Sequence, residues 1–235
     1  MLKQDAALFA EDLTRSEPGQ PPNLAYLIAA AVVLDSYYFK EDLRGKKWTE
    51  EDTVAHEFLM QHADVGHDYW QPLNHAKFDV EAGLDLGLHG IFIRDFKQYE
   101  LASGLMGVSV STGVIDKLVE RFGAAGLGEA CRSYLLSKKL GLFVIIAIQA
   151  SDDGNIEKNL MVFQLDDNPV EQALKTKGAA LCSLCEGTED MQLHNKRVLT
   201  AEQLGVPGTI TYYTIGNNRY SRKAFEAIVK TDSVW

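Results

Sequence analysis

The strongest constraint on the fold is a pair of apolar segments in the middle of the chain. The first, LGLFVIIAIQ at residues 140–149, is uncharged and rich in β-branched side chains, which is typical of a buried strand. The second, NLMVFQL at residues 159–165, follows the polar stretch SDDGN at 151–155, which favours a turn. The two segments therefore predict an antiparallel hairpin in the interior of a sheet.

The segments around this hairpin alternate between strand and helix patterns. Strands are predicted at GVSVST (107–112) and GTITYYT (208–214), and helices at 113–138 (one or two), at 169–178 and in YSRKAFEAIV (220–229). The order is strand, helices, hairpin, helix, strand, helix. It predicts an α/β (α+β-like) fold, in which helices flank a mixed β-sheet.

The N-terminal part has no strand of its own. Residues 1–16 predict a short amphipathic helix, and the uncharged run at 23–34 predicts a helix that is buried on all sides and ends at Asp35. This run is too short to span a bilayer, which takes roughly 20 residues, so we expect no membrane partner. Residues 41–52 are highly charged and predict a linker, which ends with Thr49 and Asp52 in the spacing of a helix N-cap.

Composition restricts the partners and the compartment. Of the 235 residues, 46% are hydrophobic and 24% charged, as in an ordinary globular domain, and the net charge of −10 argues against a nucleic-acid partner. The chain has 3 cysteines, which do not make a disulfide framework. No basic signal-peptide region precedes the apolar run, so we expect a cytoplasmic protein.

Two adjacent cations, Arg222 and Lys223, lie at the predicted start of the last helix. A helix N-terminus already carries partial positive charge, so these cations do not stabilise the helix. They suit a site where the helix start and the side chains bind an anion such as phosphate. A solvated basic helix start in an acidic protein explains the pair equally well.

Two further residues also have two interpretations each. Lys97, in RDFKQYE, has aromatic neighbours that can aim its ammonium at one phosphate, but a solvated face also accounts for it. Asp35 ends an uncharged helix, where a carboxylate can bind Mg²⁺ or Mn²⁺. An exposed position at the helix C-terminus accounts for Asp35 as well.

Other clusters carry weaker signals. The segment with His62, Asp64, His67 and Asp68 has metal-ligating residue types but no known metal spacing, so we interpret it as a polar loop. The pair Cys182-x-x-Cys185 is interpreted as buried thiols. The chain contains no P-loop, no GxGxxG that opens a helix after a strand, and no GxSxG.

Three segments in the order AAAVVLDSYYF, RDFKQYE with GVSVST, and YSRKAFEAIV resemble the C-terminal half of DHH-superfamily phosphoesterases. The branch is that of eukaryotic exopolyphosphatases and prune proteins, with family II inorganic pyrophosphatases as more distant relatives. The segment 34–36 is similar to the family's metal-binding aspartate motif. The segments 95–98 and 221–223 are similar to its "DYKQ" and "[ST]RK" phosphate-binding motifs.

This resemblance implies a metal-dependent phosphoanhydride hydrolase that removes terminal phosphate from inorganic polyphosphate. It implies that Lys97, Arg222 and Lys223 hold the phosphate oxygens, with Arg219 at the rim of a channel, and that Asp35 binds a divalent metal, Mg²⁺ or Mn²⁺. The family's Asp-His-His motifs do not occur in this chain. Most of the metal ligands would therefore belong to an N-terminal domain that the chain largely lacks.

The resemblance also implies a division of the chain. Residues 1–40 would be the remnant of the N-terminal DHH domain, residues 41–52 the linker and hinge, and residues 53–235 the DHH-associated phosphate-binding domain. We expect an exopolyphosphatase part that is almost inactive by itself. A prune-like phosphodiesterase, an inorganic pyrophosphatase and a non-catalytic phosphate-binding regulatory module are the alternatives.

Overall fold

The computed structural model describes residues 23–63, 68–102, 104–150, 156–166, 177–217 and 220–230. The chain divides into two compact units, residues 1–77 and 78–235. The charged segment 41–52 lies within the first unit, and its role as a linker between two family domains stays a prediction. The predicted helix at 1–16 and the turn at 151–155 fall outside the described residues.

The first unit is helical. It contains α2 (Leu24–Asp35), the 3₁₀ helix η1 (Glu41–Leu43), α3 (Glu50–Met60) and most of α4 (Trp70–Phe78). The predicted start of α3 is confirmed, because Thr49 and Asp52 form a reciprocal capping box there. No helix that the structure describes has both the length and the apolar character needed to cross a bilayer.

Helix α2 is buried on one side only. Ala25 and Ala29 lie in a small core with Leu59 of α3, whereas Leu24 is 42% and Leu27 51% exposed. The prediction of a helix buried on all sides is therefore wrong for the described residues. A uniformly apolar helix has no stripe that marks its contact face, and its neighbour α3 covers one face alone.

The second unit is built on a sheet of six strands among the described residues. The strands are β1 (Phe96–Leu101), β2 (Gly104–Thr112), β3 (Leu142–Ala150), β4 (Ile156–Leu165), β5 (Leu193–Leu199) and β6 (Gly208–Ile215), in the order β1-β2-β3-β4-β6-β5. β2 and β3 are parallel and the other pairs antiparallel. The mixed sheet and the central β3–β4 hairpin are confirmed, with Val144 opposite Val162.

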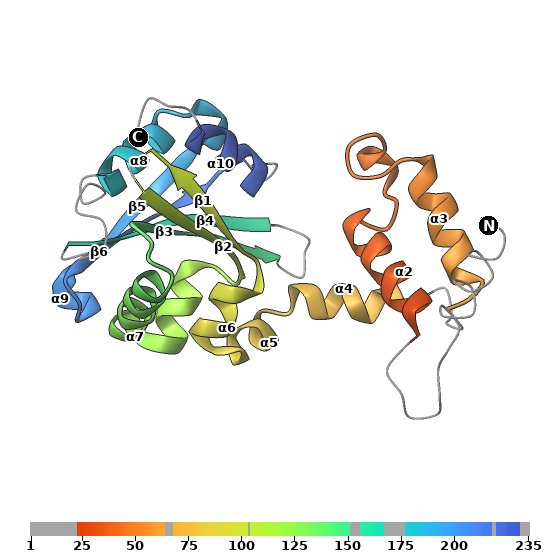
Figure 1. Ribbon diagram of the computed structural model, residues 1–235, viewed down its shortest axis with the longest axis horizontal. Coiled ribbons are helices and arrows are strands. Elements are labelled where there is room, and N and C mark those ends of the chain that lie inside the picture. The colour runs from red at the N-terminus through yellow and green to blue at the C-terminus, as the bar shows by residue number, and fades with distance from the viewer. Residues whose placement is uncertain are drawn as a thin grey trace. The chain divides into compact units, whose positions relative to one another are not determined.

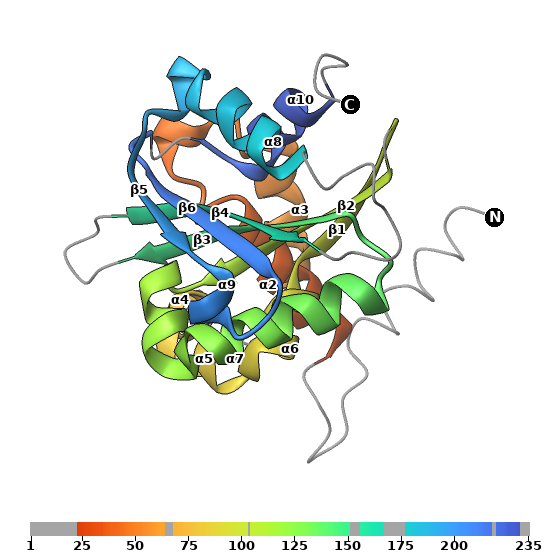
Figure 2. The same cartoon turned by 90° about the vertical axis from the view of Figure 1, so that its left-hand side faces the viewer.

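Helices cover both faces of this sheet (Figures 1 and 2). One layer contains α5 (Val80–Asp85), α6 (Gly87–Arg94), α7 (Ile115–Ser137) and α9 (Ala201–Leu204). The other contains α8 (Lys177–Glu186), the 3₁₀ helix η3 (Glu189–Met191) and α10 (Arg222–Val229). Side chains alternate along each strand, so the two layers enclose separate apolar cores on the two faces.

The long helix α7 is broken in two by a glycine. Gly123 has φ 73° and ψ 154°, a conformation that only glycine adopts without strain, and helical geometry resumes after it. The sequence left open whether residues 113–138 form one or two helices, and the structure shows two helical parts joined at this kink.

The sequence patterns missed both edge strands. β1 and β5 carry charged and polar side chains at most positions, because an edge strand exposes more of its surface than a central strand. β5 is tied to both helix layers. Arg197 bonds to Asp116 of α7 (2.6 Å), and Lys196 bonds to Glu186 of α8 (2.8 Å). The predicted helix 169–178 lies mostly outside the described residues, and α8 begins at Lys177.

Candidate anion-binding site

The last helix, α10, begins at the two predicted cations. Phe225 and Val229 bury its apolar side in the core that α8 shares, and Ser221 precedes the helix as its N-cap residue. The first turn contains no acidic residue, and the Ser221 side chain makes no capping hydrogen bond. The positive partial charge of the helix start is therefore not offset within its own first turn.

Arg222 is fixed against the start of the first strand. Its Nη1 donates to Oδ1 of Asp95 (2.5 Å) and to the backbone carbonyl of Asp95 (3.1 Å), 127 residues earlier in the chain. The same carbonyl oxygen accepts a hydrogen bond from the Val110 N–H in β2 (3.3 Å). The Arg222 side chain is 20% exposed. The guanidinium group is thus held at a defined place beside the sheet edge.

Lys97 lies on β1, two residues after Asp95. Residues two apart on a strand point to the same face, so Lys97 shares its face with Tyr99 and Leu101. Tyr99 and Leu101 pack against the core beneath α8 and α10. The alternation of β1 therefore directs Lys97, which is exposed, to the side of the sheet that α10 covers.

Electrostatic coupling between β1 and α10 supports this placement. The hydrogen bond from Lys230 lowers the pKa of the Glu226 carboxyl, and the nearby charge of Lys97 acts in the same direction. Burial raises the pKa of the Tyr99 hydroxyl, the Glu226 charge adds to this, and the Arg222 charge opposes it. Lys97 of β1 thus acts on Glu226 of α10, and Arg222 of α10 acts on Tyr99 of β1, so both cations lie near the junction of β1 and α10.

The other predicted anion ligands are only partly placed. Lys223 is exposed at the second position of α10. Arg219 lies outside the described residues. Whether Lys97, Arg222, Lys223 and Arg219 bind an anion stays a prediction.

The sequence did not single out a buried lysine near this helix start. Lys158 is 7% exposed, and its Nζ donates to the Tyr220 carbonyl (2.8 Å) directly before the N-cap of α10. The sequence does indicate this position, because Lys158 lies two residues before Leu160 and four before Val162. These two residues are buried, so the alternation of β4 places Lys158 on the same inward face. Lys158 fixes the chain where it turns into α10.

The described residues do not supply a metal site. Asp35 is exposed at the end of α2, and no group of three His, Cys, Asp or Glu side chains able to hold a metal occurs in the described ranges. Of the predicted polar loop, Asp64 and His67 lie outside these ranges. One carboxylate does not make a two-metal centre, so the described donor set does not fit the implied Mg²⁺ or Mn²⁺ pair.

Cys182 and Cys185 are buried, as interpreted from the sequence, and so is Cys131. Cys131 and Cys185 are 0% and Cys182 is 7% exposed. Burial raises the pKa of the Cys185 thiol from its ordinary 9.0 to about 12. A thiol that stays protonated at neutral pH is a poor nucleophile and a poor metal ligand, so these residues serve packing.

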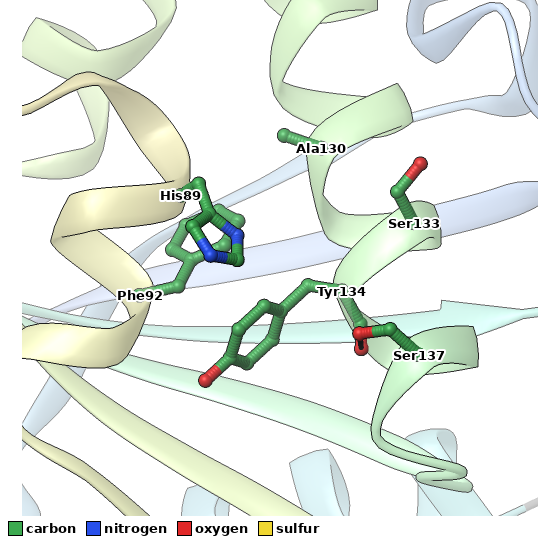
Figure 3. A pocket seen from close by; sticks show the side chains of 6 residues that line it. All are labelled: His89, Phe92, Ala130, Ser133, Tyr134 and Ser137. Atoms are coloured by element: carbon green, nitrogen blue, oxygen red, sulfur yellow. Dashed lines mark hydrogen bonds between the residues drawn. The ribbon is translucent and has the colours of Figure 1, made fainter.

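A groove on the opposite helix layer is not part of this site. It has a volume of about 320 Å³ and is lined by His89, Phe92, Ala130, Ser133, Tyr134 and Ser137 of α6 and α7. Figure 3 shows Tyr134 lying between the α6 side chains and the two serines. No Lys, Arg, Asp or Glu lines the groove, so it lacks the charges that would hold an anion.

Comparison with known proteins gives a limited result. No protein-family model matches the chain, and no curated protein sequence matches it. Among solved structures, the chain is similar to a candidate family II inorganic pyrophosphatase of Methanococcus jannaschii, with a TM-score of 0.43 and 18% identity over 67% of this chain. The chain spans about half the length of that protein, 51%. A likeness of this degree carries no argument about function.

Proposed function

We propose that the second unit binds terminal phosphate groups of inorganic polyphosphate and is the phosphate-binding part of an exopolyphosphatase. The observation that carries the proposal is that Lys97 of β1 and Arg222 of α10 both lie near the β1–α10 junction, beside the cationic first turn of α10. The chain as a whole carries a net charge of −10, so local cations at a helix start need an explanation. A phosphate ligand supplies it.

The side chains at this junction have complementary roles in the proposal. Arg222 offers planar N–H donors that match phosphate oxygens, and Lys97 offers a compact point charge. Lys223 adds a second charge at the helix start. In a hydrolase these cations would offset negative charge on the transferred phosphate and would orient the terminal group. The family resemblance implies a pair of divalent ions in such a hydrolase, and the described residues do not supply the ligands that would hold them.

The proposal predicts loss of phosphate binding on removal of single cations. Lys97→Ala and Arg222→Ala should each weaken tripolyphosphate binding about 10-fold, since each removes one charge-assisted contact, and Lys223→Ala should weaken it as well. Isothermal titration calorimetry at fixed ionic strength measures the effect.

Arg121→Ala is the matched control, because it also removes an arginine bonded to an aspartate, Asp85, but in the other helix layer. It should leave the affinity unchanged. Equal affinity of the Lys97→Ala, Arg222→Ala and wild-type proteins for tripolyphosphate would remove the proposed site.

A second candidate is a non-catalytic phosphate-binding regulatory module. Among the described residues, no group of metal-ligating side chains includes Asp35, and this favours a module without a metal centre. The two candidates share the anion site and differ in hydrolysis. Hydrolysis assays with Mn²⁺ or Mg²⁺ distinguish the two candidates. The substrates are tripolyphosphate, long polyphosphate, pyrophosphate and a cyclic nucleotide. The substrate that is hydrolysed also distinguishes an exopolyphosphatase from a phosphodiesterase and a pyrophosphatase.

For this chain alone we expect tripolyphosphate binding with almost no phosphate release, because one carboxylate cannot hold two metal ions. Phosphate release is measured by a colorimetric assay with and without the metal. Rapid metal-dependent release by the 235-residue chain would contradict this expectation and would favour a complete active site. A cytoplasmic location is part of the exopolyphosphatase proposal.

A further inference from the structure

The candidate anion site contains a carboxylate. Asp95 is half-exposed, with 48% of its side chain accessible, and it bonds to Arg222 and precedes Lys97 by two residues. A negative charge there repels an anionic ligand and lowers its affinity. The presence of Asp95 therefore calls for a compensating role.

The contacts of Asp95 suggest what that role is. Its side chain and its backbone carbonyl both accept from the same atom, Nη1 of Arg222. The carbonyl is itself fixed by the N–H of Val110 in β2. Arg222 is thus bonded to a residue whose backbone is held by the sheet.

This arrangement leaves most of the guanidinium group available. A guanidinium has five N–H donors in one plane, and Asp95 engages only Nη1. Within the described part of the chain, Nη2 and Nε of Arg222 donate to no protein group. The residue that follows Asp95 by two positions is Lys97, whose ammonium lies on the α10 side of β1. Asp95 thereby ties Arg222 of α10 to the strand that carries Lys97.

We propose that Asp95 is the positioning residue of the anion site: it holds Arg222 by Nη1 so that the remaining N–H donors and Lys97 can engage one phosphate group. This inference rests on the proposed function, since it concerns the same site. It goes further in assigning a favourable role to a residue whose charge opposes the ligand. A carboxylate that only competes with the ligand would act in the opposite direction.

The test compares three variants by calorimetric titration with tripolyphosphate. Asp95→Ala should weaken binding about 5- to 10-fold, although it removes a negative charge. The Arg222 side chain loses the hydrogen bond that holds it, so the ligand must order this side chain on binding. Asp95→Asn keeps an acceptor oxygen for Nη1 and should bind within about 2-fold of wild type. Asp85→Ala, which breaks the comparable pair with Arg121 in the other helix layer, should bind as wild type does.

A double-mutant cycle shows whether Asp95 acts through Arg222. In the Arg222→Ala background, Asp95→Ala should no longer weaken binding, since the residue it positions is absent. Thermal unfolding checks that each variant is folded, and Asp95→Ser replaces Asp95→Ala if the latter does not fold. A merely structural contact would change the unfolding midpoint of Asp95→Ala and leave its affinity for tripolyphosphate unchanged.

The outcomes separate this inference from the proposed function. If wild type binds and Arg222→Ala weakens binding, but Asp95→Ala binds as tightly as wild type or more tightly, positioning by Asp95 is overturned and the anion site stands. If neither Lys97→Ala nor Arg222→Ala changes binding, or wild type does not bind tripolyphosphate, both proposals fall. Weakening by Asp95→Ala with rescue by Asp95→Asn supports positioning.

Discussion

Phe225→Ala is expected to lower the free energy of unfolding by about 3–5 kcal/mol, the largest stability effect among these predictions. Phe225 is 1% exposed and anchors α10 in the core that the sheet shares with α8. Its loss leaves a cavity beneath the helix that carries Arg222. Anion binding should weaken as well, because α10 no longer holds its position against β1. Urea titration followed by circular dichroism measures the stability change.

Ile93→Ala is the control for Phe225→Ala. Ile93 is a large apolar residue of the same unit, but 51% of it is exposed, so its truncation removes little buried surface. We expect a change of less than about 1 kcal/mol for this variant. A loss at Phe225→Ala no greater than that at Ile93→Ala would show that α10 contributes little to the second unit.

Sequence patterns predicted the centre of the fold better than its edges. The run at 140–149 is apolar because β3 has neighbouring strands on both sides and helices on both faces. Its composition alone therefore predicts that it is buried. β1 and β5 each have one neighbouring strand, and their charged side chains follow neither period clearly. Edge strands therefore escape pattern analysis because their exposed surface carries charged side chains, which interrupt the alternation of apolar and polar residues.

The candidate site was predictable in part. Lys97, Arg222 and Lys223 were predicted as anion ligands from short motifs and from the cost of cations at a helix start, and their binding of an anion stays a prediction. The contact of Asp95 with Arg222, on which we base its proposed positioning role, was missed because its partner is 127 positions away and no local pattern encodes such a contact. The buried position of Lys158 depends likewise on where α10 begins, which only the folded chain determines.

Gly128→Ala is expected to destabilise the second unit by about 1–3 kcal/mol, although alanine is the better helix former. A Cβ at position 128 of α7 would lie 2.6 Å from the Leu204 carbonyl oxygen and 2.8 Å from its Cβ. Leu204 is completely buried, and the contact is with backbone, which cannot rotate away. The short helix α9 would have to move off α7. Urea unfolding again gives the measurement.

Two residues earlier in the same helix, Gly126→Ala provides a control of opposite sign. A Cβ there meets only the Phe122 Cβ, at 3.9 Å, so the substitution fits without strain. It should stabilise the unit by about 0.5–1 kcal/mol through reduced backbone entropy in the unfolded chain. Changes of the same sign at both positions would show that the close approach of α9 to α7 does not constrain the fold.

The contact between Arg222 and Asp95 has a consequence for the time at which this site can exist. During synthesis β1 leaves the ribosome first, and its partner on α10 follows 127 residues later. At roughly 5–20 residues per second, that gap lasts about 6–25 s. Throughout it, Asp95 has no Arg222 to bind. The contact between Arg222 and Asp95, on which the proposed anion site depends, therefore cannot form on a nascent chain before α10 has been synthesised.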